Sequence, residues 1–236
     1  MIDFLLDRII TIPMVLIALT FHELAHGIVS TKLGDPTPRM TGRLTVNPLA
    51  HLDPVGTLLM IFTGFGWAKP VSINPRYYRD PKKGMALTAL AGPMANFILS
   101  VIAMLLYAVI FIVYKKTGVF AGSIGTISRI TVTFVQLNLC FMVFNFIPIP
   151  PLDGSRILGL FLSNNAYFKI QQYERYSFIL IILMSGLGVF DRIIGTGVGF
   201  ILNGMINILD KLVMMVIKWR NLSINSRASR DLWTCS

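Results

Sequence analysis

Long apolar runs are the feature that most restricts how this chain can fold. A helix needs about 20 apolar residues to cross a hydrocarbon core of about 30 Å, and a helix satisfies its own backbone groups there. Mean hydropathy is +0.69 and only 14% of the residues are charged, as is typical of membrane proteins. The runs that approach or exceed the required length are residues 9–29, 85–114, 130–149, 178–194 and 198–217. These runs predict an all-α membrane protein, a polytopic helical bundle of about five to six transmembrane segments.

The loop after the first run contains further patterned segments. Residues 55–67 are apolar but too short to span, and they are rich in glycine and flanked by Pro54 and Pro70, which favours a re-entrant or buried segment. Residues 43–47 and 71–74 alternate apolar and polar side chains, and each segment ends in an Asn-Pro turn signal. We expect two short β-strands here, with an irregular loop as the alternative.

The positive charge is concentrated in this same loop. The net charge is +10, and residues 31–84 hold eight Lys or Arg against three Asp. The positive-inside rule therefore places the loop, the predicted re-entrant and β-strand region, residues 150–176 and the C-terminus on the cytoplasmic side. Attraction to anionic lipid explains the charge without a nucleic-acid partner. The sequence thus predicts a multi-pass protein of the cell membrane.

The chain shows no internal repeat and no low-complexity tract, and every loop is shorter than a typical domain. We therefore expect one integral membrane domain over residues 1–220 and a short basic cytoplasmic tail over 221–236. Cys140 lies in a predicted span and Cys235 in the tail, so no disulfide framework is indicated. Nothing in the sequence indicates an oligomeric state.

Ionisable residues interrupt the first apolar run. The segment "FHELAHG" fits H-E-x-x-H, in which His22 and His26 lie one turn apart on one helix face and can bind one metal ion, with Glu23 beside them to take a proton from water. Ionisable groups inside a span cost about 2.5 to 3.5 kcal/mol each on insertion scales, which a bound metal compensates. The alternative is that the histidines only bind backbone carbonyls between packed helices.

A catalytic zinc site needs three protein ligands and an open position. Asp153 is the best third ligand, because it follows a long span and lies among prolines that break the helix where irregular backbone must line a cavity or be buried. Glu174 lies in the polar stretch "QQYERY", where a surface role fits better. Capping of a helix from Gly154 is the alternative role for Asp153, and capping could accompany ligation.

Three separated motifs, "FHELAHG", "AGPMAN" and "NFIPIPPLDG", resemble those of the site-2 protease family of intramembrane zinc metalloproteases. The resemblance covers residues 19–160. It implies that His22, His26 and Asp153 bind one zinc ion per chain and that Glu23 is the general base. It also implies that Asn145 belongs to the motif that shapes the surroundings of the aspartate.

The resemblance also selects auxiliary residues. Gly92 and Asn96 match a family element near the active site, where Gly92 would permit close backbone approach and the Asn96 amide would donate to a developing oxyanion. The alternative for this element is a small-residue packing site. His51 resembles a histidine that follows "NPLA" in compact members, and we expect an auxiliary role for it.

The resemblance implies a zinc-dependent endopeptidase that cleaves transmembrane segments of single-span membrane proteins, such as membrane-tethered regulators. The chain resembles a minimal member without a PDZ or CBS module, and its active site is expected toward the cytoplasmic side. We also expect an unwound substrate to add to an edge of one of the predicted strands.

Other functions remain open at this stage. The chain could be a protease that uses Glu174 as third ligand, or a non-proteolytic zinc-binding membrane scaffold. A metal transporter is a weaker reading, hinted at only by the polar stripe Asn203, Asn207 and Asp210 on the last span.

Overall fold

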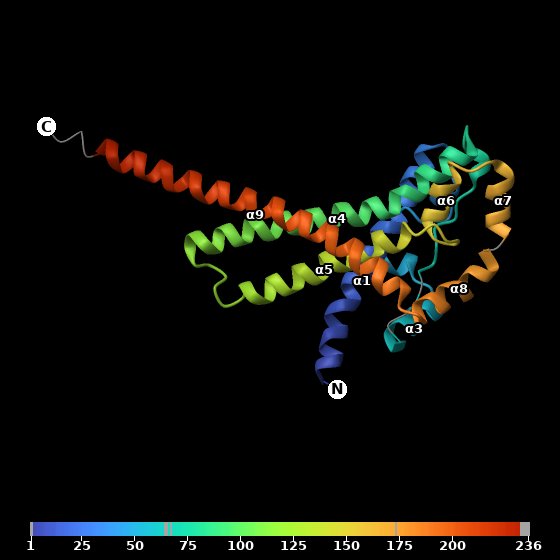
Figure 1. Cartoon of the computed structure of the whole chain (residues 1–236), viewed down its shortest axis with the longest axis horizontal. Coiled ribbons are helices and arrows are strands. Elements are labelled where there is room, and N and C mark those ends of the chain that lie inside the picture. Colours follow the sequence, from blue (N-terminus) through green and yellow to red (C-terminus); the bar gives the residue numbers. More distant parts are fainter. Residues whose placement is uncertain (1, 64–65, 67, 173, 232–236) are drawn as a thin grey trace.

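The computed structural model describes residues 2–63, 66, 68–172 and 174–231, and this part of the chain is helical (Figure 1). The elements in chain order are α1 (Ile2–Lys32), α2 (Thr37–Met40), η1 (Pro48–His51), α3 (Pro54–Thr63), η2 (Pro75–Tyr77), α4 (Pro81–Thr117), α5 (Ile124–Asn145), α6 (Asp153–Gly159), α7 (Asn164–Gln172), α8 (Glu174–Gly186) and α9 (Val189–Asp231). The prediction of an all-α protein is confirmed for the described residues.

Four helices in the described part of the chain are long and apolar enough to cross a membrane, which makes this a multi-pass membrane protein. They are Ile10–Lys32, Pro81–Thr117, Ile124–Asn145 and Val189–Met215. The predicted count of five to six is therefore wrong for these residues. The run 178–194 does not form one helix, because Gly188 adopts a left-handed conformation with φ +68° between α8 and α9. Hydropathy does not detect such a turn.

The bundle is organised around α4, which contacts α1, α5, α6 and α9. Small buried residues on its first half, Ala86, Ala89 and Gly92, allow neighbouring helices to approach closely. Val135 and Leu139 of α5 pack with Val198 of α9 in one core cluster. In Figure 1, α9 extends well beyond α4 and α5 towards the C-terminus. Residues 221–231, the start of the predicted tail, continue this helix, and residues 232–236 lie outside the described part.

Helix α5 ends earlier than the predicted span 130–149. It stops at Asn145, since Pro148 lacks the N–H that a continuing helix would need. Apolar residues after Asn145, which made this run look longer, belong to the hydrophobic core. Ile147 and Leu152 are buried in a second core cluster with Ile181 of α8 and Phe190 of α9. This packing anchors the turn that leads into α6.

The predicted β-strands are absent from the described residues. The pairing found there is an isolated antiparallel bridge between Leu52 and Ala68. Segment 71–74 does not pair as a strand because carboxylates take its backbone donors: Val71 N–H donates to Glu23 Oε2 at 2.9 Å, and Asn74 N–H donates to Asp35 Oδ2 at 2.8 Å.

Segment 43–47 is irregular as well. Its Thr45 carbonyl accepts from the His51 ring at 2.9 Å, and its Asn47 side chain accepts from Leu49 N–H at the start of η1. Part of the predicted re-entrant run 55–67 forms α3, which is too short to span, while residues 64, 65 and 67 lie outside the described residues.

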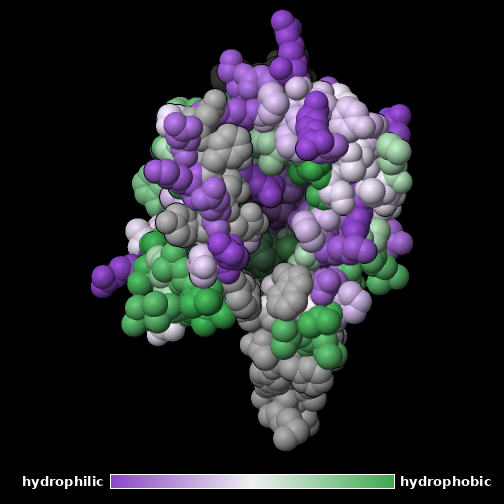
Figure 2. Space-filling model, turned by 90° about the vertical axis from the view of Figure 1, so that its right-hand side faces the viewer, coloured by the Kyte–Doolittle hydropathy of each residue, from purple (hydrophilic) through white to green (hydrophobic). Residues whose placement is uncertain are grey.

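The end of the molecule that carries α6 and α7 has two kinds of surface. In Figure 2, hydrophilic residues gather over its upper half, hydrophobic residues lie below them and at the sides, and a hollow lies between. Such a division is expected where a protein passes from a polar phase into a bilayer.

Candidate metal centre

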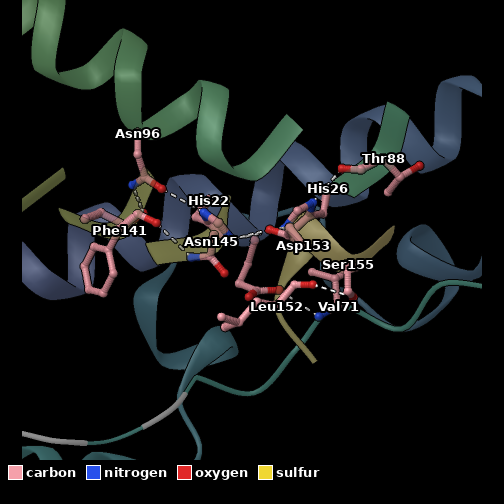
Figure 3. A network of polar contacts seen from close by, with 12 residues as sticks. His22, His26, Val71, Thr88, Asn96, Phe141, Asn145, Leu152, Asp153 and Ser155 are labelled. Atoms are coloured by element: carbon pink, nitrogen blue, oxygen red, sulfur yellow. Dashed lines mark hydrogen bonds and ion pairs between the residues drawn. The ribbon is translucent and has the colours of Figure 1, made fainter. Parts of the chain in front are cut away.

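Three side chains that could bind a metal ion converge at the junction of α1 and α6 (Figure 3). His22 and His26 lie one turn apart on α1, and Asp153 is the first residue of α6. The Nε2 atoms of the two histidines are 3.1 Å apart, and Asp153 Oδ2 lies 3.3 Å from His22 Nε2 and 3.2 Å from His26 Nε2. All three residues are buried, with 6% of their surface exposed. The structure thus brings together the three residues predicted as ligands.

The spacing of these three atoms fits a zinc ion. Zinc bonds to imidazole nitrogen and carboxylate oxygen of 2.0 to 2.2 Å, arranged tetrahedrally, place the ligand atoms about 3.4 Å apart. The three observed separations, 3.1, 3.2 and 3.3 Å, are close to this value. The donor set, two imidazoles and one carboxylate, is also one that catalytic zinc accepts.

Hydrogen bonds on the far side of each ring orient the two histidines. His22 Nδ1–H donates to Asn96 Oδ1, and His26 Nδ1–H donates to the Thr88 carbonyl, each at 2.7 Å. Because both Nδ1 atoms carry the proton, both Nε2 lone pairs point toward Asp153 Oδ2, a buried oxygen without a hydrogen-bond partner. A proton could bridge only two of these three atoms, whereas a metal ion binds all of them.

Asp153 does not cap α6. The N-cap position belongs to Leu152, and no side chain forms a capping bond there. The structure therefore does not support helix capping as the role of Asp153. Gly154 is needed for the approach of α6, because a Cβ at this position would lie 2.3 Å from the Phe146 carbonyl oxygen and 2.5 Å from that of Ile147.

Gly92 keeps the space in front of the histidines open. It is a buried residue of α4. A Cβ at this position would lie 2.5 Å from His26 Nε2 and 2.6 Å from His22 Nε2, the two nitrogens that face Asp153. The absence of a side chain thus leaves the metal-binding face of both rings free.

Glu23 follows the first histidine and is half-buried. Its Oε2 accepts a hydrogen bond from the backbone N–H of Val71 at 2.9 Å. The segment around Val71 therefore fixes the direction of this carboxylate. Sequence reasoning predicted Glu23 as the base but did not identify Val71, because a backbone donor leaves no signal in the residue type.

Asn96 has all its polar atoms engaged. Its oxygen accepts from His22, and its Nδ2 donates to the Ala18 carbonyl at 3.1 Å and to Asn138 Oδ1 at 3.0 Å. The side chain therefore orients His22 in this structure. The predicted donation to an oxyanion stays a prediction, and it requires Asn96 to release one of these two bonds.

Asn145 and His51 lie outside the three-residue group. Asn145 is the last residue of α5 and donates to the Phe141 carbonyl at 3.0 Å. His51 is buried at the end of η1, where Nε2–H donates to the Thr45 carbonyl and Nδ1 has no partner. Their predicted auxiliary roles remain predictions.

The residues behind the rival readings belong to α8 and α9. Glu174 begins α8, and its side chain is not among those that the structure describes. The polar stripe Asn203, Asn207 and Asp210 is exposed on α9.

A buried polar network that sequence reasoning missed connects the loop to His26. Asp35 accepts from Thr37 N–H, from Asn74 N–H and from the Ser30 hydroxyl. The Ser30 hydroxyl contacts Tyr78 OH at 2.8 Å, and Tyr78 OH contacts the Thr88 hydroxyl at 3.1 Å. Burial alone would raise the pKa of Asp35, but the hydrogen bonds from Thr37, Asn74 and Ser30 outweigh it and hold the pKa below its ordinary value.

An apolar cavity of about 440 Å³ lies between α1, α5, α8 and α9. Leu19, one turn before His22, lines it together with Phe141 and Phe144 of α5 and Ile181 of α8. One wall of the cavity thus lies a single helical turn from His22 on α1.

The chain is similar in sequence to known proteins. A model of peptidase family M50 matches residues 10–187, a range that includes Glu23 and the three residues of the metal centre. The chain is 40% identical over 169 residues to "Putative zinc metalloprotease YwhC" of Bacillus subtilis, covering 72% of this chain and 76% of that protein.

The chain is also 25% identical over 174 residues to "Putative zinc metalloprotease Rip2" of Mycolicibacterium smegmatis, covering 72% of this chain and 63% of that protein. The match therefore spans less than two thirds of the length of Rip2. No solved structure matches the chain.

Proposed function

This chain belongs to peptidase family M50, and from that premise we propose that it is a zinc-dependent endopeptidase of the cell membrane that cleaves transmembrane segments of single-span proteins. The observation that carries the proposal is the buried group His22, His26 and Asp153, whose two histidines lie in the second half of a candidate membrane span and whose ligand atoms have the spacing of a zinc site. One zinc ion per chain would be held by these three residues.

The chain's own residues supply the proton transfers. A zinc ion at this site supplies Lewis-acid polarisation to a water molecule and to a peptide carbonyl. The Glu23 carboxylate accepts a proton from the water whose oxygen attacks the carbonyl carbon, and it returns a proton to the amine nitrogen as the C–N bond breaks. The bond from Val71 N–H to Glu23 Oε2 holds the carboxylate in a fixed direction for both transfers.

The apolar cavity beside Leu19 supports the proposal that the substrate is hydrophobic. Its lining is mostly aliphatic and aromatic, so it suits the side chains of a transmembrane segment rather than those of a polar peptide. The basic residues of the loop after α1 support a cytoplasmic position of the site, since His26 lies in the last turns before Lys32. Membrane-tethered regulators are the proposed substrates.

Addition of the substrate to a strand edge is not part of the proposal. Both expected strands are absent, and the N–H groups of Val71 and Asn74 are already bound to carboxylates.

The test is cleavage in liposomes. Purified protein is reconstituted with a panel of fluorescently labelled single-span substrates, and products are analysed by mass spectrometry for wild type and Glu23→Gln. We expect wild type to cut within the transmembrane segment, and Glu23→Gln to bind zinc equally well but not to cut. Zinc binding by both proteins without cleavage by either would instead support the non-proteolytic scaffold.

A further inference from the structure

We propose that Asn138, on α5, is a positioning residue that keeps the proton of His22 on Nδ1, so that Nε2 stays free to bind the metal. The inference rests on the proposed zinc site. Asn138 and its partner Asn96 are both fully buried, with 0% of their surface exposed, and they lie on different candidate spans. An amide in such a place costs free energy unless it is hydrogen-bonded, and an apolar residue would pack there without that cost.

A chain of hydrogen bonds leads from Asn138 to the metal centre. Asn138 Nδ2 donates to the Phe134 carbonyl at 2.9 Å, and Asn138 Oδ1 accepts from Asn96 Nδ2 at 3.0 Å. Asn96 Oδ1 in turn accepts from His22 Nδ1–H at 2.7 Å. The outer end of the chain is thus a backbone carbonyl, and the inner end is a predicted zinc ligand.

The direction of every bond in this chain follows from the carbonyls, which can only accept. Because the Phe134 carbonyl can only accept, the Asn138 amide must turn its NH₂ toward that carbonyl and its oxygen toward Asn96. Asn96 then has two acceptors on one side, Asn138 Oδ1 and the Ala18 carbonyl, so its NH₂ faces them and its oxygen faces His22.

The opposite orientation would disable the site. If the Asn96 amide were reversed, its oxygen would lie against two other acceptors in a buried place, and its NH₂ would face His22 Nδ1. His22 would then carry its proton on Nε2, the atom 3.3 Å from Asp153 Oδ2, where a protonated nitrogen cannot bind zinc. Asn138 supplies one of the two acceptors that prevent this reversal.

Two substitutions separate positioning from packing. Asn138→Leu keeps a side chain of similar size but removes the acceptor, so Asn96 loses one of its two constraints. Asn138→Asp keeps the shape and, in its protonated form, both an acceptor oxygen facing Asn96 and a hydroxyl donor facing the Phe134 carbonyl. The matched control is Ser100→Ala, which removes a buried hydroxyl of α4 that contacts the Asn96 carbonyl of the same helix at 3.1 Å and the Val135 carbonyl of α5 at 3.4 Å.

The experiment has two readouts on full-length protein in detergent. Zinc affinity is measured by competition with a chelator, and the proton position on the histidines is measured by ¹⁵N NMR of the metal-free protein at a pH where imidazole is neutral. We expect Asn138→Leu to lower zinc affinity about tenfold, as is typical when a partner of a metal-binding histidine is lost, and to populate the Nε2–H form of His22. Asn138→Asp and Ser100→Ala should stay within about threefold of wild type.

Several results would overturn the inference. One is a folded Asn138→Leu protein with wild-type zinc affinity and only the Nδ1–H form of His22. Another is Ser100→Ala losing as much affinity as Asn138→Leu, since the effect would then be one of packing. If Asn138→Leu does not fold, loss of zinc affinity in Asn138→Asp would refute the proposal by itself. The NMR readout requires neither zinc nor cleavage, so failure of the proposed function remains distinguishable.

Discussion

Substitution of Gly92 by alanine tests the geometry of the metal centre most sharply. The added Cβ would lie 2.5 Å from His26 Nε2 and 2.6 Å from His22 Nε2, whereas ordinary contacts begin at 3.4 Å. Either the rings or the backbone of α4 must therefore move by about 1 Å, and a displacement of that size at reacting groups can cost about 10²-fold in rate. Overpacking of this kind costs about 1–3 kcal/mol.

The strain should appear mainly in zinc binding. In the metal-free protein a histidine can release its hydrogen bond to Asn96 or to the Thr88 carbonyl and turn away from the new methyl group, whereas a bound ion holds both rings in place. A cost of about 1–3 kcal/mol then corresponds to about a 5- to 150-fold loss of zinc affinity, at 1.4 kcal/mol per factor of ten. The melting temperature of the metal-free protein should change little.

The assay combines chelator competition for zinc, thermal unfolding of the metal-free protein and substrate cleavage. Gly125→Ala is the neutral control, because a Cβ there has nothing within 4 Å. Gly197→Ala is the packing control, because its Cβ would lie 3.0 Å from Val143 Cγ1 in a part of the bundle without metal ligands. Wild-type zinc affinity and cleavage in Gly92→Ala would refute the reasoning.

Three further predictions concern the surroundings of the centre. Asp35 has a lowered pKa in the folded state, so its stabilising effect is complete above its ordinary pKa of 3.8 and is lost as the pH falls through the folded pKa. Asp35→Ala should therefore have a lower melting temperature than wild type at pH 7. This difference in melting temperature should narrow below pH 4. Gly154→Ala should destabilise the protein by about 1–3 kcal/mol and weaken zinc binding, because its Cβ meets the rigid Phe146 carbonyl. Chemical denaturation measures the loss of stability, and chelator competition measures the loss of zinc affinity. Glu174→Gln should bind zinc and cleave like wild type, and loss of zinc by this variant would favour Glu174 as the third ligand.

The metal ligands could be predicted because their signal is local. His22 and His26 are one helical turn apart within a single apolar run, and Asp153 stands out because prolines break the helix just before it. The distance between Asp153 and the histidines in the chain did not matter, since each motif indicated its role independently. The structure then brings their ligand atoms within 4.8 Å of one another.

The contacts that could not be predicted from the sequence join residues that are distant in the chain. Val71 and Asn74 have the alternation of a strand, yet Glu23 and Asp35 take their backbone donors. Asn138 does leave a signal in the sequence, because an amide within an apolar span indicates a specific hydrogen-bond partner. This signal does not say which residue the partner is.

Hydropathy failed for a different reason. It averages over a window, so it joined two helices across the turn at Gly188.

Zinc stoichiometry is the measurement that tests the central claim most directly. Protein purified without added metal is analysed by inductively coupled plasma mass spectrometry for wild type, Glu23→Gln and Asp153→Asn. The account predicts one zinc per chain in wild type and in Glu23→Gln, and well below one zinc per chain in Asp153→Asn, because loss of a direct ligand should lower affinity at least as much, about 100-fold, as loss of its outer partners. Full zinc retention by Asp153→Asn, or no zinc in folded wild type, would contradict it.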